Sequence, residues 1–394
     1  MKIFSKVLKI LVLAAIISYL FWFSSGMFAD KTASNHKTEV GKKSGLKSKM
    51  ENITITEKNK DGELLQVRAV EAQISDRHVE LSKLEVVFHP SGQPPINLTS
   101  ETGFLQNKTN DAVFSGNVVV KSERPFQLES ERFDWASELK LLTTSEKVTL
   151  VRDDLTVLGK GMIMNLKTED VVVLESVRAT SSLSTITGNR GEFFNSPKKA
   201  VVTGNAKVLQ KGGKRGDKPA EDVEINSDEI QAFADEGSKE MDRVTAKGNV
   251  VIVTEDRTVT GDYGEFFKSP KKMFVSGNAM IVQKVENKGS KGVDEVHINS
   301  DEIEALSGEG GEELEKVTAR GNVIIVTEKR RITGDVTELF SKEKKVVVSG
   351  NATLKEDEDD IKGEKIIYFY DKDDIIISGG SGKRAKMLLT PQKQ

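Results

Sequence analysis

The sequence predicts an all-β protein that is built from repeated hairpins and preceded by one N-terminal transmembrane helix. Three observations lead to this fold class. Short runs rich in Val, Ile, Phe and Thr, separated by Gly, Asn, Asp and Lys, recur along most of the 394 residues. No long segment after the N-terminal region has the apolar spacing of an amphipathic helix. The phrase "AKGNVVIVTEDRTVTGD" at residues 246–262 returns as "ARGNVIIVTEKRRITGD" at 319–335, which gives a period of 73 residues.

Residues 1–28 are expected to form a short cytoplasmic head and a transmembrane anchor. Lysines at positions 2, 6 and 9 precede Ile10–Phe28, nineteen residues without a charge. That is about the length that a helix needs to cross the hydrocarbon core. A cleaved signal peptide is the alternative, but its apolar region would be shorter and a small-x-small cleavage site would follow. The basic head favours an N-terminus inside the cell and an exported body.

The body is predicted to follow a flexible stalk. Residues 29–50 are polar, rich in Lys and Ser, and non-periodic, as linkers are. Beyond them, runs such as "GNVVVK" (116–121), "DVVVLESVRA" (170–179) and "EKIIYFY" (364–370) are typical of strands. Residues 386–394 are expected to form a short tail.

The 73-residue repeat divides into two half units, because "GNV" and "SGNA" phrases alternate along it. We interpret each half unit as a β-hairpin: a strand, a polar turn, a second strand and a Gly-Asn phrase. One hairpin is marginal in water, but stacked copies share a continuous apolar face. About ten residues per strand and turn would give on the order of thirty strands in residues 51–385, divided between two facing sheets. The glycines in register with the period are Gly188, Gly261 and Gly334, and Gly204, Gly277 and Gly350.

Alternation along the strands predicts which side chains face inward. In "VVSGNATL", Val348, Gly350, Ala352 and Leu354 lie on one side, and the equivalent positions of other copies are also apolar or small. Such residues either pack a closed sandwich core or line an apolar groove, in which Gly and Ala would leave space. The predicted lining residues are Val118, Val120, Val202, Val208, Val250, Ile252, Val275, Ile281, Val323, Ile325, Val348 and Leu354.

One strand leaves its inward face open. In "GNVVIV", alternation places Val250 and Ile252 inward, but Val251 and Val253 are apolar as well. The pattern alone does not decide between the two rows.

Composition excludes several functions. The net charge of −3 gives no reason to expect nucleic acid as a partner. The chain has no cysteine, and its four histidines have no metal-ligand spacing, so we expect no metal and no cofactor. The acidic stretches 299–304 and 356–364 lack a calcium-loop pattern and are expected to be solvated loops. The Gly-Asn phrases suit turns or bulges better than phosphate binding, and no catalytic motif is present, so an enzyme is not expected.

Two parts of the chain resemble known families. The anchor, followed by "LEVVFHPSGQPPINLTSETGFL", "SGNVVV", "FQLESERFDW" and "TSEKVTLVRDDLTVLGKGMIMNLKTEDVVVLESVRA", resembles LptC, the membrane-anchored component of lipopolysaccharide export. From about residue 181, the phrases "TGDxxEFF…SGNA" and "GNVxIVTE" look like the periplasmic bridge protein LptA, also called the OstA-like fold. The resemblance therefore divides the body into an LptC-like module at 51–180 and LptA-like repeats at 181–385. Family members usually carry these modules as separate proteins.

The resemblance implies an open antiparallel β-jelly roll with the acyl chains of lipopolysaccharide in the groove between its sheets. It also implies partners: an inner-membrane ABC transporter at the N-terminal edge, and a further bridge module or the outer-membrane translocon at the C-terminal edge. The location would be the inner membrane, with one span and the body in the periplasm. Two alternatives stay open, a membrane-anchored structural or adhesin β-repeat protein and a conduit for another envelope lipid.

Overall fold

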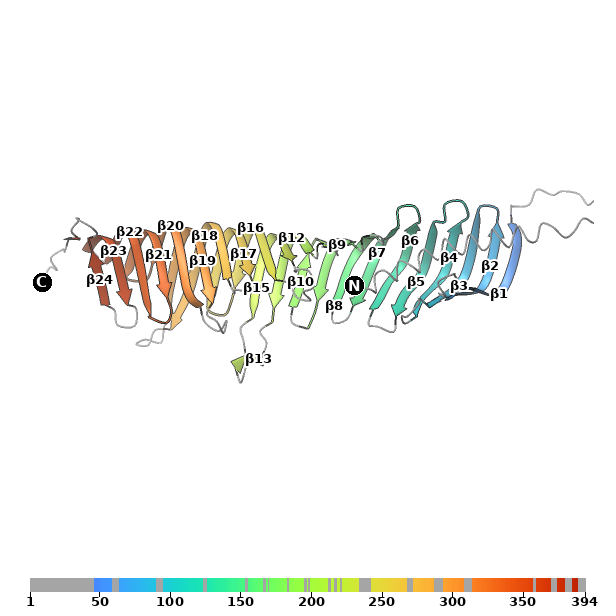
Figure 1. The fold of residues 1–394 in the computed structure, drawn as a ribbon, viewed down its shortest axis with the longest axis horizontal. Coiled ribbons are helices and arrows are strands. Elements are labelled where there is room, and N and C mark those ends of the chain that lie inside the picture. Colours follow the sequence, from blue (N-terminus) through green and yellow to red (C-terminus); the bar gives the residue numbers. More distant parts are fainter. Residues whose placement is uncertain are drawn as a thin grey trace, which may run out of the picture. The chain divides into compact units, whose positions relative to one another are not determined.

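A computed structural model describes most of residues 46–388 as an all-β structure (Figure 1). The expected anchor at 1–28 lies outside the described residues. Within the part that is described, no helix is long and apolar enough to cross a membrane. Between residues 46 and 388, the gaps in the description are 59–63, 90–94, 123–125, 153–154, 166–167, 169, 183, 195–196, 198, 212–213, 216–217, 220–221, 234–241, 268–271, 287–292, 308–313, 357–358, 370–373 and 380–384.

The chain divides into two compact units. Unit 1 takes residues up to Ser182 and the segment 189–196, and unit 2 takes 183–188 and the residues from Pro197 on. The strands of unit 1 are β1 (Leu46–Lys58), β2 (Leu64–Ser75), β3 (His78–His89), β4 (Ile96–Gln106), β5 (Ala112–Ser122), β6 (Phe126–Ala136), β7 (Leu141–Arg152), β8 (Leu155–Asn165), β9 (Asp170–Thr180) and β11 (Arg190–Phe194). From β1 to β9 each strand pairs antiparallel with the next, and β11 pairs with β9.

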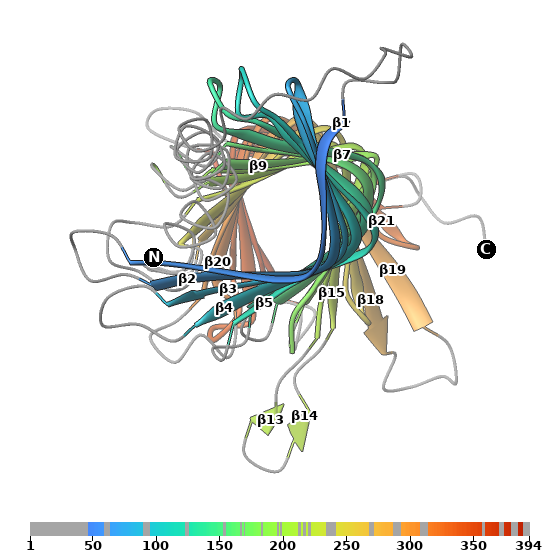
Figure 2. The ribbon, with the colours of Figure 1, turned by 90° about the vertical axis from the view of Figure 1, so that its right-hand side faces the viewer.

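Unit 2 continues the same pattern of antiparallel neighbours. Its strands are β10 (Ser184–Gly188), β12 (Lys199–Gln210), β13 (Lys214–Arg215), β14 (Lys218–Pro219), β15 (Val223–Phe233), β16 (Arg243–Val253), β17 (Arg257–Phe267), β18 (Lys272–Glu286), β19 (Val293–Ser307), β20 (Leu314–Val326), β21 (Arg330–Phe340), β22 (Lys345–Glu356), β23 (Asp359–Phe369), β24 (Asp374–Ser378) and β25 (Lys386–Leu388). β10 pairs with β12, and the order then follows the chain to β23, which pairs with both β24 and β25. The short hairpin β13–β14 stands apart from this sheet (Figure 2).

The Gly-Asn phrases lie in the middle of strands and not at their ends. In β18, Gly277 and Asn278 have φ angles of 76° and 49°, and the pairing with β19 shifts register between Ser276 and Ala279. Two successive residues with positive φ form a β-bulge that bends the strand, and Gly and Asn tolerate this conformation best. The expected bulge chemistry is confirmed, whereas the expectation that the phrase ends a strand is wrong.

The bulges also correct the expected number of strands. The two copies of the repeat are β15–β18 and β19–β22, so one period contains four strands, or two hairpins. Each strand with its turn therefore takes about 18 residues, and the described residues contain 25 strands instead of about thirty. The expectation of about ten residues was wrong because it counted the two sides of a bulge as separate strands.

Hydrogen bonding continues on both sides of each bulge, so each unit has one bent sheet in place of two separate sheets. β18 pairs with β19 through Lys272–Ser276 and again from Ala279 onward. Figure 2 shows the bend in β1 and the strands behind it. The all-β antiparallel fold is confirmed. Two expected boundaries differ, because β1 begins within the expected stalk and β25 lies within the expected tail.

Candidate functional site

Two rows of inward side chains run across the strands of unit 2, one on each side of the bulges. Directly paired residues of neighbouring strands share a face, so the pairing register defines each row. The first inward row is Val202, Ile230, Ala246, Gly264, Val275, Ile303, Ala319, Thr337, Val348 and Ile366. The second inward row is Val208, Ile225, Ile252, Val259, Ile281, Ile298, Ile325, Ile332, Leu354 and Ile361. The second row is aliphatic throughout, and Thr337 brings the one side-chain hydroxyl in the first.

The structure places most of the predicted lining residues on the buried face. Of the twelve, eleven are buried, and Val208 is half-buried. Val250 and Val323 lie at the bend between the two rows, where they pair with Gly261 and Gly334. That these side chains contact a lipid stays a prediction.

The ambiguous strand β16 is resolved by burial. Val250 and Ile252 are 1% and 4% exposed, whereas Val253 is 37% exposed and Val251 is half-buried on the outer side. The second apolar row of this strand therefore belongs to the outer face.

The glycines of the Gly-Asn phrases do not provide the inner space that the sequence suggested. A Cβ at Gly277 would lie 2.5 Å from the Oδ2 atom of the exposed Asp262, and one at Gly350 would lie 2.4 Å from Oδ2 of Asp335. In β22, the Asn351 side chain donates a hydrogen bond to Asp335 at 3.2 Å. These glycines therefore let a carboxylate close against the bend.

The repeat glycines before the bulges are filled by valine. A Cβ at Gly261 would lie 2.5 Å from Val275 Cγ1, and one at Gly334 would lie 2.5 Å from Val348 Cγ1. The inward small residues that remain are alanines, such as Ala279, which is 1% exposed.

Sequence reasoning missed part of the lining on β15 and β19. In "INSDEI", Ile225 and Ile230 are five residues apart and so have opposite parity, yet both rows take one of them. A register shift between Asn226 and Glu229 restores the inward direction. The matching "INSDEI" at 298–303 behaves in the same way, so the signal was the repeated Ile spacing and not alternation.

The interior is covered in this state. Val275 and Leu354 are each 0% exposed, and Ile281 is 5% exposed. The two rows therefore pack against other side chains and leave no open trough at these positions. Within the described residues, no cluster of three His, Cys, Asp or Glu side chains could hold a metal ion.

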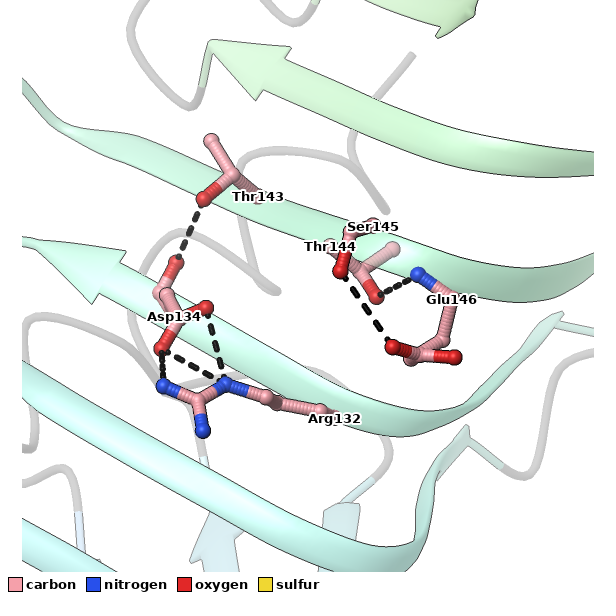
Figure 3. A network of polar contacts seen from close by, with 6 residues as sticks. All are labelled: Arg132, Asp134, Thr143, Thr144, Ser145 and Glu146. Atoms are coloured by element: carbon pink, nitrogen blue, oxygen red, sulfur yellow. Dashed lines mark hydrogen bonds and ion pairs between the residues drawn. The ribbon is translucent and has the colours of Figure 1, made fainter. Parts of the chain in front are cut away.

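A polar network on β6 and β7 of unit 1 was considered as a second site (Figure 3). Arg132 donates hydrogen bonds to both carboxylate oxygens of Asp134, and this raises the pKa of Arg132. The Glu146 backbone N–H donates to Thr144 Oγ1 at 3.1 Å, and Ser145 donates to the Glu146 carboxylate at 3.3 Å. The group lies where the β7 strand changes register with its neighbours, so its contacts stabilise the bulge.

Two stretches of the chain match known families. Residues 10–182 match the family described as lipopolysaccharide-assembly, LptC-related. Residues 291–374 match the family described as LptA/(LptD N-terminal domain) LPS transport protein.

The other comparisons gave one further similarity. No curated protein matches the chain. A crystal structure of LptH, described as the LptA homologous periplasmic component of the conserved lipopolysaccharide transport device from Pseudomonas aeruginosa, matches with 16% identity and a TM-score of 0.21. That match covers 43% of this chain and 95% of LptH. From the two family matches, this chain is an LptC-like protein that carries LptA-like repeats.

Proposed function

We propose that the chain is a periplasmic component of lipopolysaccharide transport that is anchored in the inner membrane and holds the acyl chains of the lipid on its inward rows. The observation that carries this proposal is the pair of almost wholly aliphatic rows in unit 2, in a chain that matches two families of lipopolysaccharide assembly and transport. These matches also agree with the expectation that the chain is not an enzyme.

Binding would exchange one set of apolar contacts for another. Because the inward side chains are covered, an acyl chain would enter by parting the two rows. Each methylene group that leaves water would contribute ~0.8 kcal/mol to occupancy. Successive strands present similar aliphatic side chains, so a lipid would meet nearly the same surface at each step and could slide along the rows.

The ends of the sheet suit a handover between proteins. Among the described residues, β1 pairs only with β2, and an open strand edge is a site for strand addition by a partner. We propose that the N-terminal edge meets the ABC transporter, and that β24 and β25 meet a further bridge module or the outer-membrane translocon. The sequence has no nucleotide-binding motif, so the energy would come from ATP hydrolysis in the transporter.

The covered interior favours a second candidate. A structural β-repeat protein would have a permanently dry and closed core, and inward side chains that are almost fully buried fit that description. A conduit for another envelope lipid would use the same rows. Both alternatives differ from the proposal in what the inward side chains contact in cells.

Site-specific photocrosslinking separates these functions. Ile252 and Val253 are adjacent on β16 and similar in size, but one is inward and the other outward. We expect lipopolysaccharide adducts from a photoreactive residue at Ile252 and at Val348, and none from Val253. Equal adducts at both faces, or none, would contradict the proposal, and adducts with phospholipid alone would support the other conduit.

A further inference from the structure

A row of alternating cations and aromatic rings runs along one end of the strands of unit 2, on the outer face. Every second strand brings a Lys or Arg, and all but one of the strands between them bring a Phe. This rim row is Lys199, Phe233, Arg243, Phe267, Lys272, Leu306, Lys316, Phe340, Lys345 and Phe369. Its cations lie about 9.6 Å apart, since strands are spaced by ~4.8 Å.

The rings and the cations contact each other. Lys199 Nζ lies 5.3 Å and Arg243 Cζ 4.4 Å from the ring centroid of Phe233. Lys316 Nζ and Lys345 Nζ lie 5.2 Å and 4.7 Å from the ring of Phe340. The aromatic faces hold the cations at the rim by cation–π attraction and keep their charge.

Carboxylates on the outer face neutralise the middle of the row. Arg243 pairs with Glu265 at 3.4 Å, and Lys272 pairs with Glu304 at 3.0 Å. The hydrogen bond from Lys272 is the largest cause that lowers the pKa of Glu304. Within the described part of the chain, Lys199 and Lys345 contact rings and no carboxylate, so their charges are available to a ligand.

The row belongs to the repeats of unit 2. Lys199, Lys272 and Lys345 recur at the 73-residue period, as do Arg243 and Lys316. In unit 1, the strand ends on the same side of the β5 bulge pair Ala136, Leu141, Asn165 and Asp170 in their place. A bent antiparallel sheet therefore forms without such a row.

The other end of the unit 2 strands is chemically mixed. Its outer pairs include Glu224 with Val253, and Lys355 with Asp360. The alternation of cation and ring is thus confined to one rim.

The rim row lies close to the inward rows. Each cation precedes a residue of the first inward row by three positions, as Lys272 precedes Val275 and Lys345 precedes Val348. Three residues of strand span about 10 Å. Because Lys199, Arg243, Lys272 and Lys345 are the first residues of their strands, their long side chains can reach past the edge of the sheet.

We propose that the rim row binds phosphate groups on the head of a lipid whose acyl chains lie on the inward rows. The inference rests on the proposed function and specifies the polar half of its site. Lys and Arg form charge-assisted hydrogen bonds to phosphate, and basic side chains with aromatic rings are favoured where apolar and polar environments meet. Lys199 and Lys345, which have no competing carboxylate among the described residues, would contribute most.

The test measures binding of the full-length protein to lipopolysaccharide, to the same lipid after enzymatic removal of its phosphates, and to inorganic phosphate. The variant is K199Q with K345Q. The control is K247Q with K355Q, which removes the same charge from the outer face away from the rim row. We expect the variant to bind the phosphorylated lipid about tenfold more weakly, since a tenfold change corresponds to the loss of about 1.4 kcal/mol.

The other arms separate the possible failures. The dephosphorylated lipid should bind the variant, the control and the unaltered protein equally, and inorganic phosphate at equal concentration should not compete. Equal loss in the variant and the control would overturn the proposal, because net charge would then explain the effect. Unchanged binding by the variant would overturn the rim row and leave the acyl site standing, whereas a protein that binds neither lipid would overturn both. Competition by inorganic phosphate would show a phosphate site that is independent of the lipid.

Discussion

Unit 1 and unit 2 share one architecture but fill it differently. The largest fully buried side chains of unit 1 include Trp135, Phe133 and Met162. In the first inward row of unit 2, two of the neighbouring positions are Ala246 and Gly264. The same bent sheet can thus be closed by bulky side chains or covered by a thin aliphatic layer. Only the second arrangement could exchange its contacts for an acyl chain without opening a large cavity.

The largest expected effect follows from the bulky core of unit 1. Phe133 is 1% exposed on β6, so F133A should destabilise unit 1 by about 3–5 kcal/mol, through lost burial and the cavity left behind. Hydrogen exchange resolved by segment is the suitable measurement, because stacked strands need not unfold in one step. We expect β5–β7 to lose protection.

A conservative change in unit 2 provides the contrast. Ile303 is 0% exposed, and I303V should cost only about 0.5–1.5 kcal/mol. If F133A were as mild as I303V, unit 1 would not be the tightly packed unit, and the comparison would fail.

The thin layer of unit 2 should resist added volume. Ala246 is 0% exposed in the first inward row, and A246L should cost about 1–3 kcal/mol by overpacking. If acyl chains use this space, the same variant should also reduce lipopolysaccharide adducts at Ile252. Thr353, which points outward on β22, gives the control T353L, which should leave the adducts unchanged. A variant A246L that crosslinks normally would indicate that lipid does not pass this position.

Sequence reasoning could predict the features that depend on neighbours along one strand. Alternation placed Val348 and Leu354 on the buried face, and the structure agrees. The fixed period located the repeats, and β17 and β21 begin 73 residues apart. These signals survive because side-chain direction in a strand has a period of two.

Features that depend on register across strands could not be predicted. Lys199 and Phe233 are far apart in the sequence and become neighbours only through the pairing of β12 with β15. The bulges also reset parity, so Ile225 and Ile230 seemed to face opposite sides. A Gly-Asn phrase is compatible with either a turn or a mid-strand bulge, and its local sequence does not distinguish them.

The bend itself should be equally important in both units. Gly277 of unit 2 and Gly116 of unit 1 have φ angles of 76° and 79°, and a Cβ at either would contact a carboxylate within 2.6 Å. Left-handed backbone costs roughly 1–2 kcal/mol for a residue with a side chain, so G277A and G116A should destabilise their units by similar amounts in hydrogen exchange. A large loss in one unit alone would mean that the two bends are not equivalent.

The smallest expected effect is a gain in stability at Thr337. This residue is 2% exposed in the first inward row, and its hydroxyl has no hydrogen-bond partner in the described structure. Replacing an unpaired buried hydroxyl with a methyl group of the same shape should stabilise unit 2 by up to about 1 kcal/mol. T337V should therefore raise the thermal midpoint slightly. The matched change T353V should lower it, because the Thr353 hydroxyl is hydrogen-bonded to that of Thr333 on the outer face. If T337V were destabilising instead, the hydroxyl would have a partner in the interior of unit 2, and that interior would be less dry than the aliphatic rows indicate.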